Sequence, residues 1–382
     1  MKNLAWHKCV FTLTRAIVKP IIKHKMKYEY QRYPMPDKPC LILANHTTDL
    51  DPALVSLGIS KHCYFLASEH AFRAGFGSRV LKMLYDPIAF NKVRTDISAI
   101  KQMIFRMKNG ANICLFPEGN RTFTGATMPF ALSVTKLAKA SGADIITFRI
   151  EGGYLTSPRW SKTMRKGKMF GRVVRHITQA ELADMTEEQV LKAISTDIYE
   201  DAYVQQGTQP IHYCGKRLAE HIETALFLCP QCEGIGTLKS KGNQFYCDCG
   251  LAGLYTETGH LEGDDLPFSQ TTDWGIWQSA HLASVIDNID DRPICSDTGQ
   301  ALYKVHHASG KVLVGKGDIS INHDALHCCG MVFPLENIMK FAVVGQMTLL
   351  FAEKQGDMYE VRSQTFRSAL KYKEIFRVLT KR

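Results

Sequence analysis

The sequence lacks any uninterrupted apolar run of ~18 residues, the length that a membrane-spanning helix needs. We therefore expect no transmembrane span. The N-terminus also lacks the apolar core and small-residue cleavage site of a secretory signal peptide. We expect a chain on the cytoplasmic side of a membrane, where its twelve cysteines stay reduced. Half of them stand alone in the sequence: Cys9, Cys40, Cys63, Cys114, Cys214 and Cys295.

Acidic residues are scarce relative to basic ones, and the net charge is +10. Such an excess suits nucleic acid, anionic lipid headgroups, or a phosphorylated substrate or donor. At 382 residues the chain is too long for one small core, so its length predicts roughly two or three domains.

The first 30 residues are basic, with Glu29 as the single acid. Apolar residues recur between the charges at helical spacing: Val10, Leu13, Ile17, Val18, Ile21 and Ile22. This pattern predicts an amphipathic helix lying in a membrane interface, its lysines facing anionic headgroups. Pro20 predicts a kink or a break into two helices. The alternative is a helix packed on the domain behind it, with its lysines merely solvated.

From residue 40 onward, short apolar runs alternate with helical stretches. The runs predict buried strands at 40–44, 63–67, 112–116 and 144–150, and helices are expected at 52–58, 74–85, 96–109 and 129–141. Gly58, Gly110 and Gly142 follow helical stretches, where C-cap glycines belong. Alternation of this kind predicts an α/β domain with a mostly parallel sheet and flanking helices.

The segment Asn45-His46-Thr47-Thr48-Asp49-Leu50-Asp51-Pro52 directly follows the first predicted strand, where α/β sheets place their ligands. An extended chain would separate His46 from Asp51 by ~16 Å, so the segment must turn. Asp51 before Pro52 has the signature of an N-cap, which could return the carboxylate to the imidazole. An aspartate that orients a histidine makes a general base. No serine or cysteine nucleophile accompanies the pair, so direct transfer is favoured over a covalent intermediate. Taken alone, a helix cap beside a stray histidine explains these residues better than catalysis does.

A second polar segment, Phe116-Pro117-Glu118-Gly119-Asn120-Arg121, follows another predicted strand and should reach the same edge of the sheet. Arg121 offers a forked donor suited to phosphate. Gly119 allows the backbone to approach a ligand closely, and Glu118 can accept hydrogen bonds from hydroxyl groups. Lys92 and Arg94 add cationic groups upstream.

Together, these segments resemble the paired N-H-x₄-D and F-P-E-G-T-R blocks of the glycerolphosphate acyltransferase superfamily, in its 1-acylglycerol-3-phosphate acyltransferase (PlsC-like) branch. The resemblance covers roughly residues 25–180. It implies an acyltransferase-type domain that moves a fatty acyl group from acyl-CoA or acyl-ACP to the free hydroxyl of 1-acylglycerol 3-phosphate, in phospholipid biosynthesis. His46 would be the general base and Asp51 its orienting partner. Glu118, Gly119 and Arg121 would hold the glycerol phosphate.

The sequence departs from the family pattern at three places. Asn120 replaces a threonine, and Ile146-Thr147-Phe148 lacks a proline found in the family's fourth block. Lys92 stands where the family carries a phosphate-binding arginine, so the contact with phosphate is expected to be rearranged or shared with Arg94. The acceptor therefore stays open among 1-acylglycerol 3-phosphate, glycerol 3-phosphate and another lysophospholipid.

Residues 157–175 form a second basic stretch, which is either a solvated face or a landing surface. The landing surface would take lipid headgroups or an acidic donor such as coenzyme A or an acyl carrier protein. The expected partners are therefore membrane phospholipid and lysophospholipid, with the protein bound peripherally, and an acyl carrier protein is a further candidate.

Cys229-Pro-Gln-Cys232 and Cys247-Asp-Cys249 form two tight pairs. Four thiolates in two pairs are typical of a closed structural zinc site. Such a site would stabilise a small ribbon rather than take part in chemistry.

Beyond residue 300, alternating segments and a final amphipathic helix at 367–379 have the outline of a pleckstrin-homology-like barrel. The predicted domains are thus an interface helix (1–30), an acyltransferase domain (31–210), a zinc ribbon (225–256) and a β-rich domain (273–382). A non-enzymatic alternative is a membrane or nucleic-acid binding protein that works through its zinc ribbon. The intact His46–Asp51 pair disfavours that alternative, and with it nucleic acid as a partner.

Overall fold

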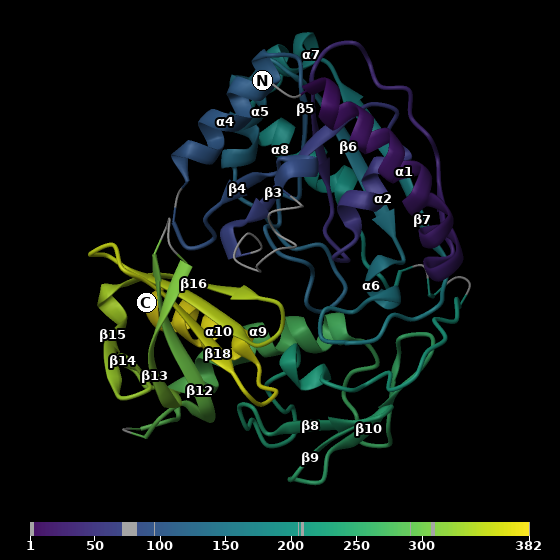
Figure 1. Ribbon diagram of the computed structural model, residues 1–382. Coiled ribbons are helices and arrows are strands. Elements are labelled where there is room, and N and C mark those ends of the chain that lie inside the picture. The colour runs from purple at the N-terminus through teal and green to yellow at the C-terminus, as the bar shows by residue number, and fades with distance from the viewer. Residues whose placement is uncertain are drawn as a thin grey trace. The chain divides into compact units, whose positions relative to one another are not determined.

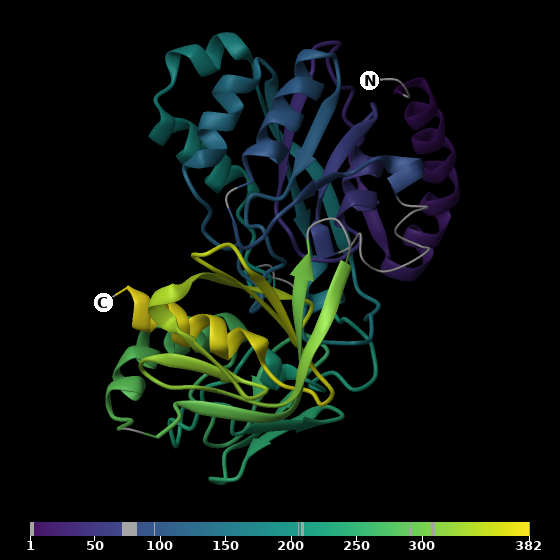
Figure 2. The same cartoon turned by 60° about the vertical axis from the view of Figure 1, so that its left-hand side comes forward.

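The computed structural model describes residues 4–70, 82–94, 96–204, 206–207, 210–290, 292–306 and 310–381 (Figures 1 and 2). The chain divides into two compact units. The first comprises Met1–Pro158 and Met164–Cys214, and the second comprises Arg159–Thr163 and Gly215–Arg382. The finer division into four domains stays a prediction.

The first unit is built on a seven-stranded sheet in the order β1-β7-β6-β2-β5-β3-β4. All neighbouring pairs are parallel except β6 and β7, so the mostly parallel α/β sheet is confirmed. The strands are β1 (Tyr28–Tyr30), β2 (Cys40–Ala44), β3 (Cys63–Ser68), β4 (Ile88–Phe90), β5 (Asn112–Leu115), β6 (Asp144–Glu151) and β7 (Met169–Ile177). The helices are α1 (Leu4–Met26), α2 (Asp51–Gly58), α4 (Ile97–Lys108), α5 (Ser133–Ser141), α6 (Gly153–Thr156), α7 (Gln179–Asp184) and α8 (Glu187–Ile198).

Strand β2 lies in the middle of the sheet, and both of its faces are buried. Leu41 and Leu43 enter one core with side chains of α4, α5 and α8, whereas Ile42 and Ala44 enter a second core with those of α1 and α2. This split follows from the two-residue period of a strand. Helices cover the sheet on both faces (Figure 2).

Three local expectations are corrected or limited by the structure. Pro20 does not break α1, because Phe11 before it and Ile22 after it are both buried, which offsets the cost of a proline inside a helix. Gly110 and Gly142 adopt the left-handed conformation that C-cap glycines need, but Gly58 does not. A Cβ at Gly58 would lie 2.5 Å from the Phe148 ring, so close packing requires this glycine. The helix expected at 74–85 lies largely outside the described residues.

The basic stretch at 157–175 is not exposed along its whole length, although both interpretations of the sequence require exposed basic side chains. Arg159 and Arg165 are buried, with 6% and 2% of their surface exposed. Arg159 donates to the carbonyl of Gly345, a structural contact inside the second unit.

The second unit begins with a four-stranded antiparallel sheet in the order β11-β10-β9-β8. Its strands are β8 (Leu238–Lys241), β9 (Gln244–Cys247), β10 (Ala252–Tyr255) and β11 (Leu261–Glu262). Helix α9 (Thr271–Asp287) follows and shares a core with this sheet, since Trp274 packs with Phe245 and donates to the Leu228 carbonyl.

The remainder of the second unit is a seven-stranded antiparallel sheet in the order β15-β14-β13-β12-β18-β17-β16. Its strands are β12 (Cys295–His306), β13 (Gly310–Ile321), β14 (Ala325–Cys328), β15 (Met331–Pro334), β16 (Ile338–Val344), β17 (Thr348–Glu353) and β18 (Met358–Ser363). The first strand pairs with the last, and helix α10 (Ala369–Thr380) follows. The β-rich region with a C-terminal helix is therefore confirmed.

Candidate active site

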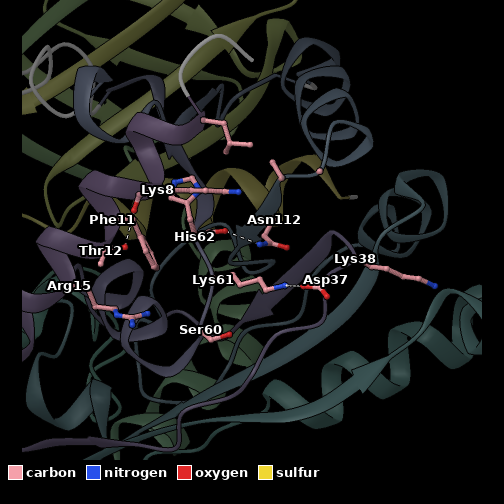
Figure 3. A pocket seen from close by; sticks show the side chains of 13 residues that line it. Lys8, Phe11, Thr12, Arg15, Asp37, Lys38, Ser60, Lys61, His62 and Asn112 are labelled. Atoms are coloured by element: carbon pink, nitrogen blue, oxygen red, sulfur yellow. Dashed lines mark hydrogen bonds and ion pairs between the residues drawn. The ribbon is translucent and has the colours of Figure 1, made fainter.

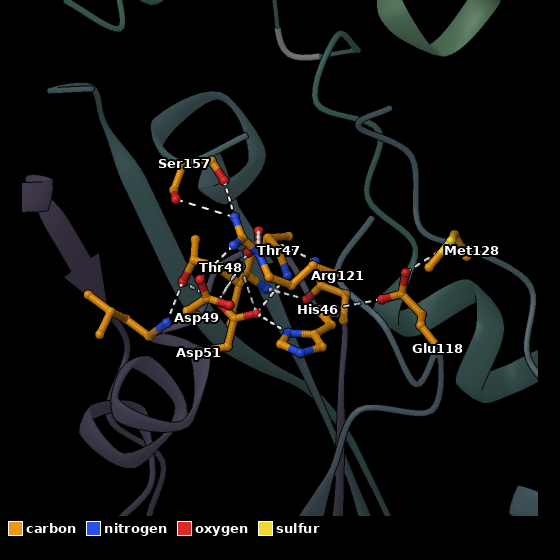
Figure 4. Close-up of polar contacts among 12 residues, drawn as sticks. His46, Thr47, Thr48, Asp49, Asp51, Glu118, Arg121, Met128 and Ser157 are labelled. Carbon is orange, nitrogen blue, oxygen red and sulfur yellow. Dashed lines mark hydrogen bonds and ion pairs between the residues drawn. The ribbon is translucent and has the colours of Figure 1, made fainter. Parts of the chain in front are cut away.

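The two polar segments identified in the sequence meet at one edge of the sheet (Figure 4). They follow β2 and β5, which are parallel neighbours with Leu43 opposite Leu115. The Thr122 amide donates to the His46 carbonyl at 2.9 Å, so the segments are joined by their backbones. On the other side, the Asn45 side chain pairs with the amide and the carbonyl of Ile150 at 2.7 and 2.8 Å. The chain that carries His46 is therefore held from both flanks.

Asp51 is hydrogen-bonded to His46, with 2.8 Å between Oδ2 and Nδ1. Asp51 is not the N-cap of α2 as predicted, because that position belongs to Leu50 and Asp51 is the first helical residue. The wholly buried carboxylate instead accepts the Thr47 amide at 2.6 Å and the Thr48 amide at 3.0 Å. It stabilises the turn before the helix rather than the helix's own first amides.

The His46 ring is positioned as a base. The Asp51 carboxylate accepts a hydrogen bond from His46 Nδ1. The neutral ring therefore carries its proton on Nδ1, and Nε2 is the basic nitrogen. The ring stacks on Phe116 at 4.5 Å between centroids, and 21% of the side chain is exposed. Nε2 makes no hydrogen bond within the described part of the chain. It can therefore take a proton from a bound molecule.

Glu118 binds the His46 backbone and connects two loops. Its Oε1 accepts the His46 amide at 2.7 Å, and its Oε2 accepts the Met128 amide at 2.8 Å. Burial raises the pKa of Glu118 to about 8, and the nearby Asp51 carboxylate adds to this rise. The next residue, Gly119, turns the chain with a φ of +68°, a conformation that favours glycine.

Arg121 is held within the site. Its Nε donates to the Thr47 carbonyl at 3.0 Å, Nη1 pairs with Asp49 at 2.8 Å, and Nη2 donates to Ser157. The Asp49 side chain is 84% exposed, so this ion pair lies at the surface.

Lys92 reaches the same loop, since its Nζ donates to Asn120 Oδ1 at 2.9 Å. The structure thus gathers most of the residues singled out in the sequence: His46, Asp51, Lys92, Glu118, Gly119 and Arg121. Arg94 follows in the Lys92 loop, just after the buried Val93.

Sequence reasoning missed several residues that shape this edge. Asn45 was noticed only as part of a motif, and Ser157 carried no signal at all. Glu200, at the end of α8, accepts the Gly152 amide at 3.0 Å, while its own backbone pairs with Thr127. Burial raises the pKa of Glu200 to about 8, with Glu151, Asp201 and Glu118 adding to the shift. Its role depends on tertiary contacts that no local pattern reports.

The four paired cysteines of the second unit form one cluster: Cys229, Cys232, Cys247 and Cys249. Their sulfurs all lie within 4.8 Å of one another. The Cys229–Cys249 and Cys232–Cys247 sulfurs are 3.7 and 3.8 Å apart. A tetrahedral zinc ion with bonds of about 2.3 Å would place its sulfurs about 3.8 Å apart, so the donor set fits zinc.

The comparisons with known proteins agree with this geometry. Residues 23–151 match the family model described as Acyltransferase. The chain is 27% identical over 128 residues to the chloroplastic 1-acyl-sn-glycerol-3-phosphate acyltransferase BAT2 of Brassica napus, covering 32% of this chain and 36% of that protein. It is 26% identical over 163 residues to the 1-acyl-sn-glycerol-3-phosphate acyltransferase of Pseudomonas aeruginosa, covering 41% of this chain and 60% of that protein.

The residues matched by the family model all lie in the first unit. The chain spans less than two thirds of the length of either curated relative, 36% and 60%. Among solved structures, the 1-acyl-sn-glycerophosphate acyltransferase PlsC of Thermotoga maritima is similar, with 21% identity and a TM-score of 0.43 over 50% of this chain and 78% of that one.

The raised pKa of Glu200 predicts a pH-dependent stability. Between the pKa of an unfolded glutamate, about 4.3, and the folded value of about 8, the folded protein binds more protons than the unfolded chain. The free energy of unfolding should therefore fall as the pH rises from 5 to 8, by up to about 1.4 kcal/mol per pH unit for each such group. Glu200→Gln should reduce this slope, and chemical denaturation at several pH values measures it.

The exposed Glu29 provides a matched control, because Glu29→Gln should leave the slope unchanged. A Glu200→Gln variant with the slope of the wild type would show that Glu200 is ionised in the folded protein.

Proposed function

We propose that this protein is an O-acyltransferase that moves a fatty acyl group from acyl-CoA or acyl-ACP to the free hydroxyl of 1-acylglycerol 3-phosphate, a step of phospholipid biosynthesis. The observation that carries the proposal is the 2.8 Å His46–Asp51 pair at a sheet edge that also holds Lys92 and Arg121. The names of the two relatives, which describe 1-acyl-sn-glycerol-3-phosphate acyltransferases, support the choice of acceptor.

His46 acts as the general base in this proposal. Its Nε2 removes the proton of the acceptor hydroxyl while that oxygen attacks the thioester carbonyl. A C–O bond forms, the C–S bond breaks, and the proton passes from His46 to the leaving thiolate. The Asp51 carboxylate stabilises the imidazolium that exists between these two events.

The acceptor's phosphate would lie among Lys92, Arg94 and Arg121. Arg121 already binds the exposed carboxylate of Asp49, and a phosphate oxygen can replace that anion without leaving the guanidinium unpaired. Glu118 and Gly119 would form the floor beneath the glycerol. Since both Glu118 oxygens bind backbone amides, its main contribution would be to hold His46 in place.

Glycerol 3-phosphate or another lysophospholipid could use the same phosphate contacts, and these are the alternative acceptors. Lys92 supplies a point charge and not the planar pair of donors that an arginine would offer. The site would therefore bind the phosphate without fixing its orientation. A binding protein without activity is the alternative of a different class. It would have no use for a histidine whose tautomer is fixed by a buried carboxylate.

We also propose that Cys229, Cys232, Cys247 and Cys249 hold a structural zinc ion. Four thiolates leave no open coordination position, so the metal would stabilise the β8–β11 ribbon and take no part in acyl transfer.

Peripheral membrane binding would come through α1. One face of this helix is packed on the domain by Val10, Phe11 and Met26, which is the alternative weighed from the sequence. A separate stripe stays exposed: Trp6, Leu13, Ile17 and Ile21. No helix among the described residues is long and apolar enough to cross a membrane. An apolar stripe beside lysines suits the bilayer interface.

Substitution of the proposed base tests the chemistry. His46→Ala should lower kcat for thioester consumption with lysophosphatidate by about 10²–10⁴-fold, since general base catalysis is lost. His24→Ala, at an exposed position of α1, should have no effect. Turnover by His46→Ala at the rate of the wild type would contradict the mechanism.

The phosphate contact is tested at Lys92. Lys92→Met should raise the KM for lysophosphatidate about tenfold with little change in kcat, because one charge-assisted hydrogen bond is removed. Lys92→Arg should restore the KM, and Lys101→Met on the exposed face of α4 should leave it unchanged. A lower kcat at constant KM would count against binding of the phosphate here.

Metal analysis tests the ribbon. The protein should contain about one equivalent of zinc, and Cys229→Ser or Cys247→Ser should lose it, because a four-thiolate site needs every ligand. The exposed Cys9 serves as control, since Cys9→Ser should retain the metal. A protein that keeps its ribbon folded after metal removal would refute the proposal.

Vesicle sedimentation tests the interface helix. Leu13→Ser combined with Ile17→Ser should release the protein from phosphatidylglycerol-containing vesicles, because each exposed apolar side chain contributes about 1.5–3 kcal/mol when buried. Both positions are solvent-facing, so the fold should survive, unlike after deletion of the packed helix. Val312→Ser, at an exposed apolar residue of β13, is the control. Complete retention of the double variant in the pellet would argue against the interface.

A further inference from the structure

A basic pocket of about 440 Å³ lies at the end of the sheet where β2, β3 and β5 begin (Figure 3). Its walls come from α1 and from the residues that precede β2, β3 and β5, whereas His46 follows β2. Four cationic side chains line it: Lys8, Arg15, Lys38 and Lys61. The pocket is therefore separate from the candidate active site.

The charge of this pocket is not balanced by its own residues. Asp37 is the single carboxylate among the described lining residues, and it pairs with Lys61 at 2.6 Å. Lys8 and Lys38 make no side-chain ion pair within the described chain. Arg15 uses Nη1 to donate to the Ile59 carbonyl at 3.0 Å, which leaves further guanidinium donors available. An unbalanced cluster of cations in a pocket attracts an anion.

Burial supports this interpretation of the cluster. Desolvation and the nearby Arg32 lower the pKa of Arg15. The same effect, together with neighbouring cations, lowers the pKa of His62 to about 4, so His62 adds no positive charge at neutral pH. The pocket thus keeps its positive charge on the lysines and Arg15, and an anionic ligand would stabilise all of them.

A second, apolar pocket of about 340 Å³ adjoins the first. Phe11 and Arg15 line both, so the two pockets meet at these side chains. The apolar pocket lies among α1, α2 and β3, with Val18, Leu57 and Phe65 in its wall. Cationic and apolar surfaces therefore lie side by side, joined by an arginine that is 5.6 Å from the Phe11 ring.

We propose that the two pockets form one binding site for a single-chain amphiphile with a phosphate head. The phosphate would lie among Lys8, Arg15 and Lys38, and the hydrocarbon chain would fill the apolar pocket beside α2. An arginine can bind a phosphate through two parallel hydrogen bonds, and a lysine adds a point charge. Burial of the chain adds the hydrophobic contribution that makes such a ligand bind more tightly than phosphate alone.

This site does not depend on the proposed acyltransferase activity. It uses Lys8 and Arg15 of α1, which lie one heptad apart on the helix, whereas the exposed stripe uses Leu13 and Ile17. The amphiphile and a membrane surface could therefore contact different faces of the same helix.

Isothermal titration of the full-length, metal-containing protein with monomeric dodecyl phosphate tests the proposal. This probe has no glycerol hydroxyl, so it cannot be an acceptor substrate. We expect binding of about one equivalent, with inorganic phosphate and the uncharged dodecyl maltoside at least about tenfold weaker.

Variants locate the bound probe. Lys8→Glu with Lys38→Glu should weaken binding of dodecyl phosphate at least about tenfold, whereas Lys101→Glu, the same charge change on α4, should not. Both lysines are exposed, so the fold should be retained. Ala67→Phe should weaken binding by filling the apolar pocket, with thermal unfolding as the check on its fold.

Several results would overturn the proposal. If inorganic phosphate binds as tightly as dodecyl phosphate, the site binds an anion but no hydrocarbon chain. If dodecyl maltoside binds as tightly as dodecyl phosphate, the site binds the chain but does not recognise the phosphate. Binding that is lost in His46→Ala but not in the lysine variant would place the probe in the candidate active site. If the lysine variant loses only its binding to anionic vesicles, the cluster is a flat electrostatic contact.

Failure of this proposal is distinguishable from failure of the proposed function. A protein that consumes thioester normally but does not bind dodecyl phosphate contradicts only the amphiphile site. A protein that binds the probe as expected but transfers no acyl group contradicts only the acyltransferase.

Discussion

The buried carboxylate of Asp51 is the interaction on which the candidate active site depends. It accepts hydrogen bonds from the backbone of Thr47 and Thr48 and from the His46 ring. These donors, together with the N-terminal end of α2, stabilise a negative charge that has no access to water. One carboxylate therefore shapes the turn, begins the helix and determines which nitrogen of His46 can act as a base.

The parallel sheet brings the rest of the site to this carboxylate. Because β2 and β5 are neighbours, the Glu118–Arg121 loop lies beside the His46 loop, and Glu118 holds the His46 amide. Two glutamates with raised pKa values, Glu118 and Glu200, lie behind the site. At neutral pH these two carboxyl groups therefore add little negative charge to the site.

Much of this arrangement could be predicted from the sequence, because it depends on local patterns. Buried strands alternating with helices predicted the parallel sheet, and the order of the two polar segments predicted that they would meet. The rest depends on tertiary contacts. The partners of Arg121 and the role of Glu200 come from segments distant in the chain, and the packing of Gly58 against Phe148 has no sequence signal. Arg159 and Arg165 were expected at the surface under both interpretations of the basic stretch, because composition cannot distinguish a buried arginine from an exposed one.

The tautomer of His46 is the central claim of this account, and nitrogen-15 NMR of the imidazole measures it directly. A His46→Gln variant identifies the signal among those of the other histidines. At a pH where the ring is neutral, the account predicts a proton on Nδ1, shared with Asp51, and an unprotonated Nε2. A neutral ring with its proton on Nε2 would contradict the account, because that nitrogen could not then accept the proton of an acceptor hydroxyl.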